Sequence, residues 1–167
     1  MVGKCLNTDT AWTNTNRLMS KIEPQGIIDL NVIARRIISE YFPEFSSCYL
    51  ITKFSHVKGS ISEVHHIYPF EDNQYKGEIV IFIDDSMIIS GVKAILGAIA
   101  HDIAHRVGWQ GPGYSLTSDR EADNIIIEKG LCSYLLEAKK ALEELRPEAV
   151  INGYSSKDLQ AILDGDY

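Results

Sequence analysis

The chain has 167 residues, of which 45% are hydrophobic, so it is long enough for one domain with a sizeable core. Its formal net charge of −7 argues against a general nucleic-acid binder, because phosphate contacts need a basic face. No apolar run reaches the roughly 20 residues of a membrane-spanning helix, and the first residues lack the apolar region of a signal peptide. We therefore expect a cytoplasmic protein that has no nucleic-acid or membrane partner.

The cysteines support the same compartment. Cys5, Cys48 and Cys132 are widely spaced and odd in number, which fits neither a disulfide framework nor a CxxC zinc pattern. We predict reduced thiols.

The N-terminal part of the chain divides into an arm and a helix. Residues 1–26 are polar, rich in Asn and Thr, and show no hydrophobic period, which predicts an irregular arm before a single domain over residues 27–167. From Ile28 an apolar stripe with helical spacing begins. Asp29 is suited to cap this helix, and Pro43 marks its end.

Three segments then show the alternation and the β-branched and aromatic residues that are typical of strands. They are Cys48–Phe54, Ile61–Tyr68 and Glu78–Asp84. Because the connections between them are short, we predict a small antiparallel sheet of about three strands.

Helices follow to the end of the chain. Met87 to Val107 reads as one long helix, and a Gly/Pro loop separates it from a helix whose start at Ser118 carries a capping box with Glu121. Gly130 is expected to interrupt this helix before another over Leu131–Leu145, and a short helical tail closes the chain. The predicted fold class is α+β.

The candidate functional residues lie on both sides of that Gly/Pro loop. His101 and His105 are four residues apart, so on a helix they lie on one face, where two imidazoles can bind one metal ion. The helix around them is too apolar for two idle imidazoles, because buried polar groups need partners. Asp119, Glu121 and Asp123 follow, and one of these carboxylates can supply a third ligand.

The order HDIAH followed by DREAD resembles the gluzincin metallopeptidases, whose motifs are HExxH and ExxAD. The resemblance covers about residues 95–130. It implies a zincin-like fold that binds one Zn²⁺ ion, with His101, His105 and Asp119 as ligands. It also implies that Asp123 orients a ligand histidine and that Asp102 is the base that takes a proton from the attacking water.

The motifs depart from the family at two positions. Asp102 and Asp119 stand where the family has glutamates, and each loses one methylene, about 1.5 Å of reach. The resemblance therefore implies a weak or inactive peptidase. Glu121 is an alternative third ligand, although it points to another side of the helix from Asp123 and already belongs to the capping box.

Peptides or proteins are the substrates that the resemblance implies, bound along an edge strand for which Glu78–Asp84 is the candidate. Two alternatives remain. The adjacent pair His101 and Asp102 also resembles the HD-domain phosphohydrolases, which are all helical and need an upstream histidine such as His65 or His66. The aspartates also fit a non-catalytic metal-binding or regulatory protein with a metallopeptidase fold.

Overall fold

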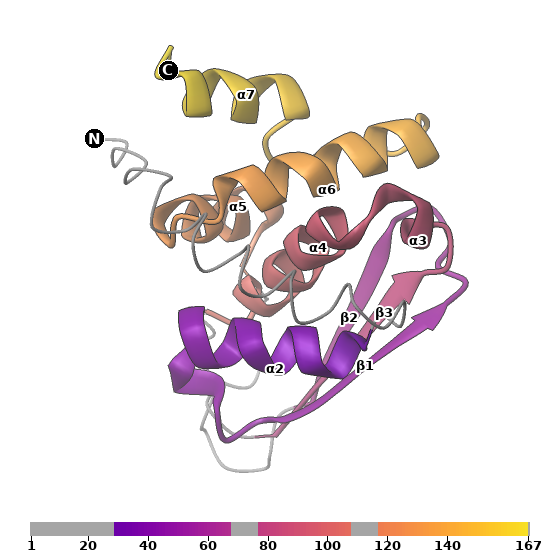
Figure 1. Ribbon diagram of the computed structural model, residues 1–167, viewed down its shortest axis with the longest axis vertical. Helices are drawn as coiled ribbons and strands as arrows, with labels where there is room; N and C mark the ends of the chain where they lie inside the picture. Colours follow the sequence, from indigo (N-terminus) through magenta and orange to yellow (C-terminus); the bar gives the residue numbers. More distant parts are fainter. Residues whose placement is uncertain (1–28, 68–76, 108–116, 167) are drawn as a thin grey trace.

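The computed structural model describes residues 29–67, 77–107 and 117–166. The expected N-terminal arm and the Gly/Pro loop lie outside these ranges. The described residues form a three-stranded sheet packed against six α-helices (Figure 1). The elements are α2 (Leu30–Tyr41), the 3₁₀ turn η2 (Pro43–Phe45), β1 (Tyr49–Ser55), β2 (Ser62–Ile67), β3 (Glu78–Asp84), α3 (Met87–Ser90), α4 (Val92–Ala104), α5 (Asp119–Glu128), α6 (Cys132–Leu145) and α7 (Ser156–Asp164).

The sheet is mixed, which corrects the antiparallel prediction. Its strand order is β1-β3-β2, with β3 parallel to β1 and antiparallel to β2. The strand positions were predicted well, but pairing does not follow from the length of a connection. Strand β3 is the most apolar of the three and takes the central place, where it pairs on both sides.

The connection between β1 and β2 makes this order feasible. Residues 56–61 must span two strand spacings, about 10 Å, because β3 lies between the strands that they join. The segment crosses the end of β3, where the buried carboxylate of Asp84 accepts the N–H of Val57 at 2.9 Å. Asp84 also accepts the N–H of Ser86 at 3.0 Å and pairs with Arg146 at 3.1 Å. One buried carboxylate thus fixes the crossing.

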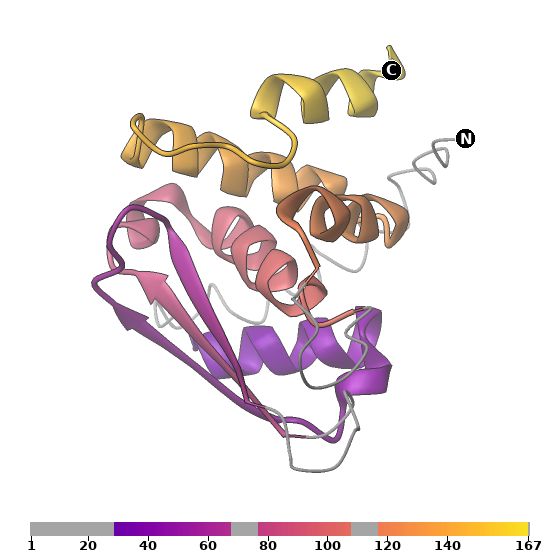
Figure 2. The same ribbon diagram turned by 180° about the vertical axis from the view of Figure 1, so that it is seen from behind.

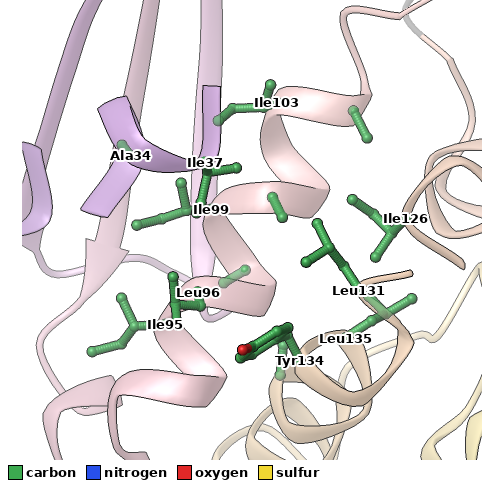
Figure 3. Packing of buried hydrophobic residues seen from close by; sticks show 14 of the residues in the cluster. Ala34, Ile37, Ile95, Leu96, Ile99, Ile103, Ile126, Leu131, Tyr134 and Leu135 are labelled. Carbon is green, nitrogen blue, oxygen red and sulfur yellow. The ribbon is translucent and has the colours of Figure 1, made fainter. Parts of the chain in front are cut away.

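The core lies between the sheet and the helices that follow it. Helices α2 and α4 cover one face of the sheet, and α6 packs on the far side of α4, with α7 outermost (Figures 1 and 2). Helix α4 is central because apolar residues point from it in both directions. Ile99 and Ile103 meet Ile37 of α2, whereas Leu131 and Leu135 approach α4 from the other side (Figure 3).

The long helix expected over Met87–Val107 is broken. Gly91 has φ +84°, a value that favours glycine, and it separates the short α3 from α4. Helix α4 ends at Ala104, so that His105 is its C-cap residue. The other helix boundaries agree with the sequence. Capping boxes begin α5 at Ser118 and α7 at Ser155, and residues 129–131 separate α5 from α6.

The structure bears on two of the expectations, the absence of a membrane-spanning helix and the state of the cysteines. No helix within the described ranges is long and apolar enough to cross a membrane. Among the described residues, Cys48 and Cys132 are buried and form no disulfide, as predicted, whereas Cys5 lies outside these ranges.

Helices α4 and α6 approach so closely that only glycine fits at one contact. A Cβ added at Gly97 would lie 2.1 Å from the carbonyl oxygen of Tyr134. Alanine is the better helix former by roughly 1 kcal/mol, so an isolated α4 would gain from Gly97→Ala. We expect the variant instead to lose about 2–3 kcal/mol of unfolding free energy, because the helices must separate. Urea unfolding measures this loss. Glu128→Ala, at an exposed helical position, is the control, and an unchanged Gly97→Ala midpoint would contradict the close contact.

Asp84 should make stability depend on acid pH. Burial raises the pKa of Asp84, but the hydrogen bonds from Ser86 and Val57 and the charge of Arg146 outweigh it and lower the pKa to about 2. A depressed folded-state pKa adds stability above the unfolded value, here roughly 2 kcal/mol, which is lost as the pH falls from about 4 to about 2. Unfolding of the wild type and Asp84→Asn across this range should show their difference shrinking. A constant difference would rule out the Asp84 contribution.

Candidate metal centre

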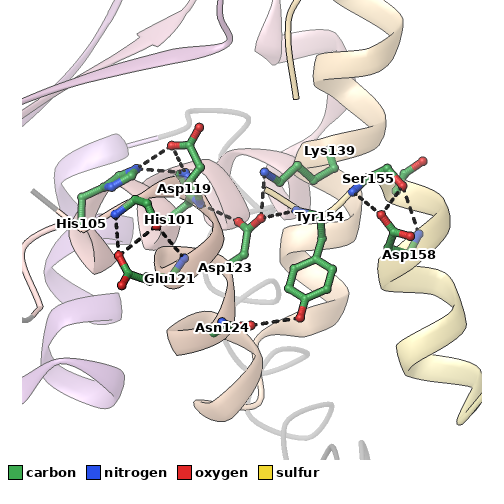
Figure 4. Close-up of polar contacts among 12 residues, drawn as sticks. His101, His105, Asp119, Glu121, Asp123, Asn124, Lys139, Tyr154, Ser155 and Asp158 are labelled. Atoms are coloured by element: carbon green, nitrogen blue, oxygen red, sulfur yellow. Dashed lines mark hydrogen bonds and ion pairs between the residues drawn. The ribbon is translucent and has the colours of Figure 1, made fainter. Parts of the chain in front are cut away.

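Helices α4 and α5 bring four of the predicted site residues together. His101 lies in the last turn of α4 and His105 caps it, while Asp119 begins α5 and Asp123 follows one turn later (Figure 4). The imidazoles of His101 and His105 lie edge to face, with ring centroids 4.7 Å apart. The ending of α4 has therefore not separated the pair.

Three ligand atoms converge in this group. Nε2 of His101 lies 3.1 Å from Nε2 of His105, and Oδ1 of Asp119 lies 3.7 Å from the first and 3.3 Å from the second. A point equidistant from the three atoms would lie about 2.0 Å from each, which is the Zn–N and Zn–O bond length. His101, His105 and Asp119 thus form a group that could hold a metal ion.

The opposite nitrogens of the two imidazoles have partners of their own. Nδ1 of His105 lies 2.6 Å from the backbone carbonyl of Thr117, which can only accept, so this nitrogen carries a proton. Nδ1 of His101 lies 2.9 Å from Oδ1 of Asp123 in an ion-pair contact. The Thr117 carbonyl places the proton of His105 on Nδ1 and leaves its Nε2 lone pair free to bind a cation, and the Asp123 carboxylate favours the same arrangement in His101.

The electrostatics of the group favour positive charge at its centre. Although burial lowers the pKa of His101, the nearby carboxylates of Asp119 and Asp123 raise it to about 9. The adjacent imidazoles of His101 and His105 hold the pKa of Asp119 well below its usual range. A proton or a metal cation relieves the repulsion among the three converging electron pairs, and a divalent cation can satisfy all of them at once.

Asp102 lies beside the group and is buried, with 5% of its surface exposed. Burial raises the pKa of its carboxyl to about 6, against the opposing effects of the His101 charge and a hydrogen bond with Ser62. One of its oxygens, Oδ2, has no hydrogen-bond partner among the described residues. Asp102 therefore keeps one oxygen that no group among the described residues occupies.

A cleft of about 280 Å³ opens next to these residues. His101, Asp102, His105 and Asp119 line one side of it, and Lys139 lines another. Residues 59–64, which lead into and begin β2, and residues 149–152, between α6 and α7, also line it, together with apolar residues of α4 and α6. Both polar and apolar side chains bound the cleft. Its volume of about 280 Å³ leaves room for a group larger than water beside the candidate ligands.

The other candidates from the sequence lie elsewhere. Glu121 is exposed, and its carboxylate accepts hydrogen bonds of 2.9 Å from the backbone N–H and the hydroxyl of Ser118, as the capping box predicted. His65 is exposed and lies 2.8 Å from Glu63. His66 is half-buried, and burial lowers its pKa to about 3. None of these side chains belongs to the metal group found within the described ranges.

Sequence reasoning missed the groups that support the site. Thr117 was not singled out because its contribution is a backbone carbonyl, for which side-chain identity gives no signal. Lys139 contacts Asp123 at 3.1 Å and was not singled out either. A signal for Lys139 did exist, because it follows Leu135 by four residues and precedes Leu142 by three, on the apolar side of α6.

Comparisons with models of protein families, with curated proteins and with solved structures found no match for this chain. The three-stranded sheet is inconsistent with the all-helical fold of the HD-domain alternative. What the structure supports is a group suited to a metal ion; the identity of the ion and the role of each ligand stay predictions.

The ligand set can be tested by zinc titration. We expect the wild type to bind a single Zn²⁺ ion, and His101→Ala, His105→Ala and Asp119→Asn each to weaken binding by at least about a hundredfold, more than loss of an outer partner does. Calorimetric titration together with elemental analysis of the dialysed protein measures affinity and stoichiometry.

Two variants serve as controls. Glu121→Gln removes the competing carboxylate, and His65→Ala removes an exposed imidazole. Both should bind zinc as the wild type does. If Glu121→Gln weakens binding and Asp119→Asn does not, Glu121 is the third ligand and the geometry described above is wrong.

Proposed function

We propose that the chain is a zinc-dependent metallopeptidase-like hydrolase that cleaves peptide bonds. The observation that carries the proposal is the convergence of His101, His105 and Asp119 on one point beside a cleft. Three protein ligands with room left for a fourth is the composition of a catalytic zinc site, whereas structural zinc sites close all four positions with protein. The motif order HDIAH and DREAD points to the same chemistry.

The ligand-orienting contacts suit this role. Asp123 and the carbonyl of Thr117 fix the rotation of the two imidazoles, so the Nε2 atoms are held in place before any ion arrives. A bound zinc ion would supply the Lewis acidity that activates water and polarises a carbonyl. The protein supplies the remaining parts, which are the proton acceptor and the substrate-binding surface.

Asp102 is the proton acceptor in this proposal. It follows His101 directly, lines the same cleft and has an unpartnered oxygen. It would take the proton from the attacking water and pass it to the leaving amine. Its side chain is one methylene shorter than that of the glutamate in HExxH enzymes, so a modest rate is expected.

Strand β2 is a better substrate platform than β3. The candidate edge strand Glu78–Asp84 is wrong, because β3 is central and paired on both sides. Strand β2 lies at the edge, and its first residues line the cleft beside the metal group. An extended peptide could add to this edge through backbone hydrogen bonds. That geometry favours a peptide over a phosphate ester as substrate.

A non-catalytic metal protein is the second candidate. The observation that favours it is also at Asp102, whose short side chain is buried and hydrogen-bonded with Ser62. A carboxylate held in this way can stabilise the protein without reaching a water. The two functions differ in what happens when the missing methylene is restored.

The test is cleavage of a fluorogenic peptide library by the zinc-loaded protein. We expect measurable hydrolysis that Asp102→Asn reduces by about a hundredfold or more in kcat, with zinc stoichiometry unchanged, as for loss of a general base. Asp85→Asn, an exposed aspartate in a turn, should retain the wild-type rate. If the wild type binds zinc, cleaves nothing, and Asp102→Glu gains activity, the non-catalytic function is correct.

A further inference from the structure

Asp123 is a buried carboxylate with more partners than the orientation of one histidine requires. Its exposed fraction is 0%, and its two oxygens have different neighbours. Oδ1 faces Nδ1 of His101 at 2.9 Å. Oδ2 accepts the backbone N–H of Tyr154 at 2.8 Å and lies 3.1 Å from Nζ of Lys139 (Figure 4). The second oxygen is thus occupied entirely by groups outside α4 and α5.

We propose that Lys139 and the Gly153–Tyr154 backbone are positioning elements of the metal centre, which act on the ion through Asp123 and His101. The proposal rests on the metal centre described above, but not on peptide hydrolysis. Lys139 belongs to α6, and residues 153–154 belong to the connection between α6 and α7. The centre would then depend on the C-terminal third of the chain as well as on its two motifs.

The first step of the argument is charge. An isolated buried carboxylate is costly, and it either finds a compensating charge or takes up a proton. Lys139 is itself buried, with 7% of its surface exposed. Within the described residues, its ion-pair partner is Asp123. The ammonium group therefore compensates the charge of the carboxylate that faces Nδ1 of His101.

The second step is orientation. A carboxylate can rotate about its Cβ–Cγ bond, so a single contact to His101 would leave its plane free. The N–H of Tyr154 and the ammonium of Lys139 both bind Oδ2, which fixes that plane and leaves only Oδ1 for the imidazole. Removing either partner loosens the carboxylate without touching a ligand.

The third step is space. A Cβ added at Gly153 would lie 2.0 Å from Oδ2 of Asp123 and 3.2 Å from Nζ of Lys139. The backbone at this position therefore lies against the carboxylate, and any side chain there would push Asp123 or the segment away. The absence of a Cβ is what lets the segment approach a carboxylate so closely.

Residues 153–156 are themselves held by several contacts, so they can position the Asp123 carboxylate. The hydroxyl of Tyr154 lies 3.1 Å from Oδ1 of Asn124, and the guanidinium of Arg120 lies 3.2 Å from the centre of the Tyr154 ring. Two residues after Tyr154, at the start of α7, Ser156 donates its backbone N–H to Glu143 of α6 at 2.8 Å. Residues 153–156 are thus fixed to both α5 and α6.

The experiment measures Zn²⁺ affinity by competition with a chelator, together with the visible spectrum of the Co²⁺-substituted full-length protein. Lys139→Met and Gly153→Ala should each weaken Zn²⁺ binding about tenfold, toward the low end of the range for outer partners of a ligand. Each should also change the Co²⁺ bands, because the position of His101 changes. Lys140→Met, at the exposed neighbouring position that pairs with Glu137, should leave affinity and spectrum as in the wild type.

A double-mutant cycle separates positioning from general stability. Asp123→Asn alone should weaken Zn²⁺ binding by about 10- to 100-fold, and adding Lys139→Met to it should cause little further loss, because the lysine acts through the carboxylate. Gly153→Ala provides the same comparison if Lys139→Met does not fold.

Three results are decisive. Unchanged affinity and spectrum in Lys139→Met and Gly153→Ala, with only a lower unfolding temperature of the metal-free protein, would make these residues structural and overturn the proposal. Fully additive losses in the cycle would overturn it as well. A wild type that binds no zinc removes the metal centre and this proposal together, whereas zinc binding without peptide cleavage removes only the proposed hydrolase.

Discussion

Three electron-pair donors held within 3.1 to 3.7 Å of one another are the constraint around which this structure is arranged. Such a cluster is unfavourable unless a proton or a cation lies between the donors, so the fold must hold it together by other means. The backbone of Thr117 and the carboxylate of Asp123 do this by fixing the far side of each imidazole. The capping box at Ser118 fixes the start of α5, whose first residue, Asp119, lies opposite the two imidazoles.

The rest of the fold is easier to understand from that centre. Helix α4 has to carry two histidines at one end and still be buried on almost every side. It achieves this with small residues, of which Gly97 lets α6 come within contact of its backbone. The close approach of α6 in turn brings Lys139 to Asp123. On the sheet side, Asp84 fixes the crossing segment that delivers the first residues of β2 to the cleft. The packing of α4 against its neighbours therefore also sets the geometry of the site.

The sequence predicted what local patterns control and failed where pairing or backbone groups decide. Asp29 and Ser118 marked the starts of their helices correctly, because a cap is a contact within four residues. The histidine pair was equally local. Strand order is not a local property, because the central position of β3 depends on how all three strands pair. Gly91 was predicted to lie inside a helix. A glycine is compatible with a helix as well as with a positive φ, so its identity alone does not reveal the break.

The same distinction explains the supporting shell of the site. Asp123 could be placed beside a histidine by motif spacing alone, but its second oxygen faces groups 16 and more residues away, in α6 and before α7. In the sequence, this contact is indicated by a lysine on the apolar side of α6. That lysine becomes informative when a buried carboxylate is known to need a partner. The histidines show that a metal could bind. The buried ion pair of Lys139 and Asp123 is costly to build and could be replaced by apolar packing, so the positioning role proposed for the lysine and for the glycine beside it would account for their presence.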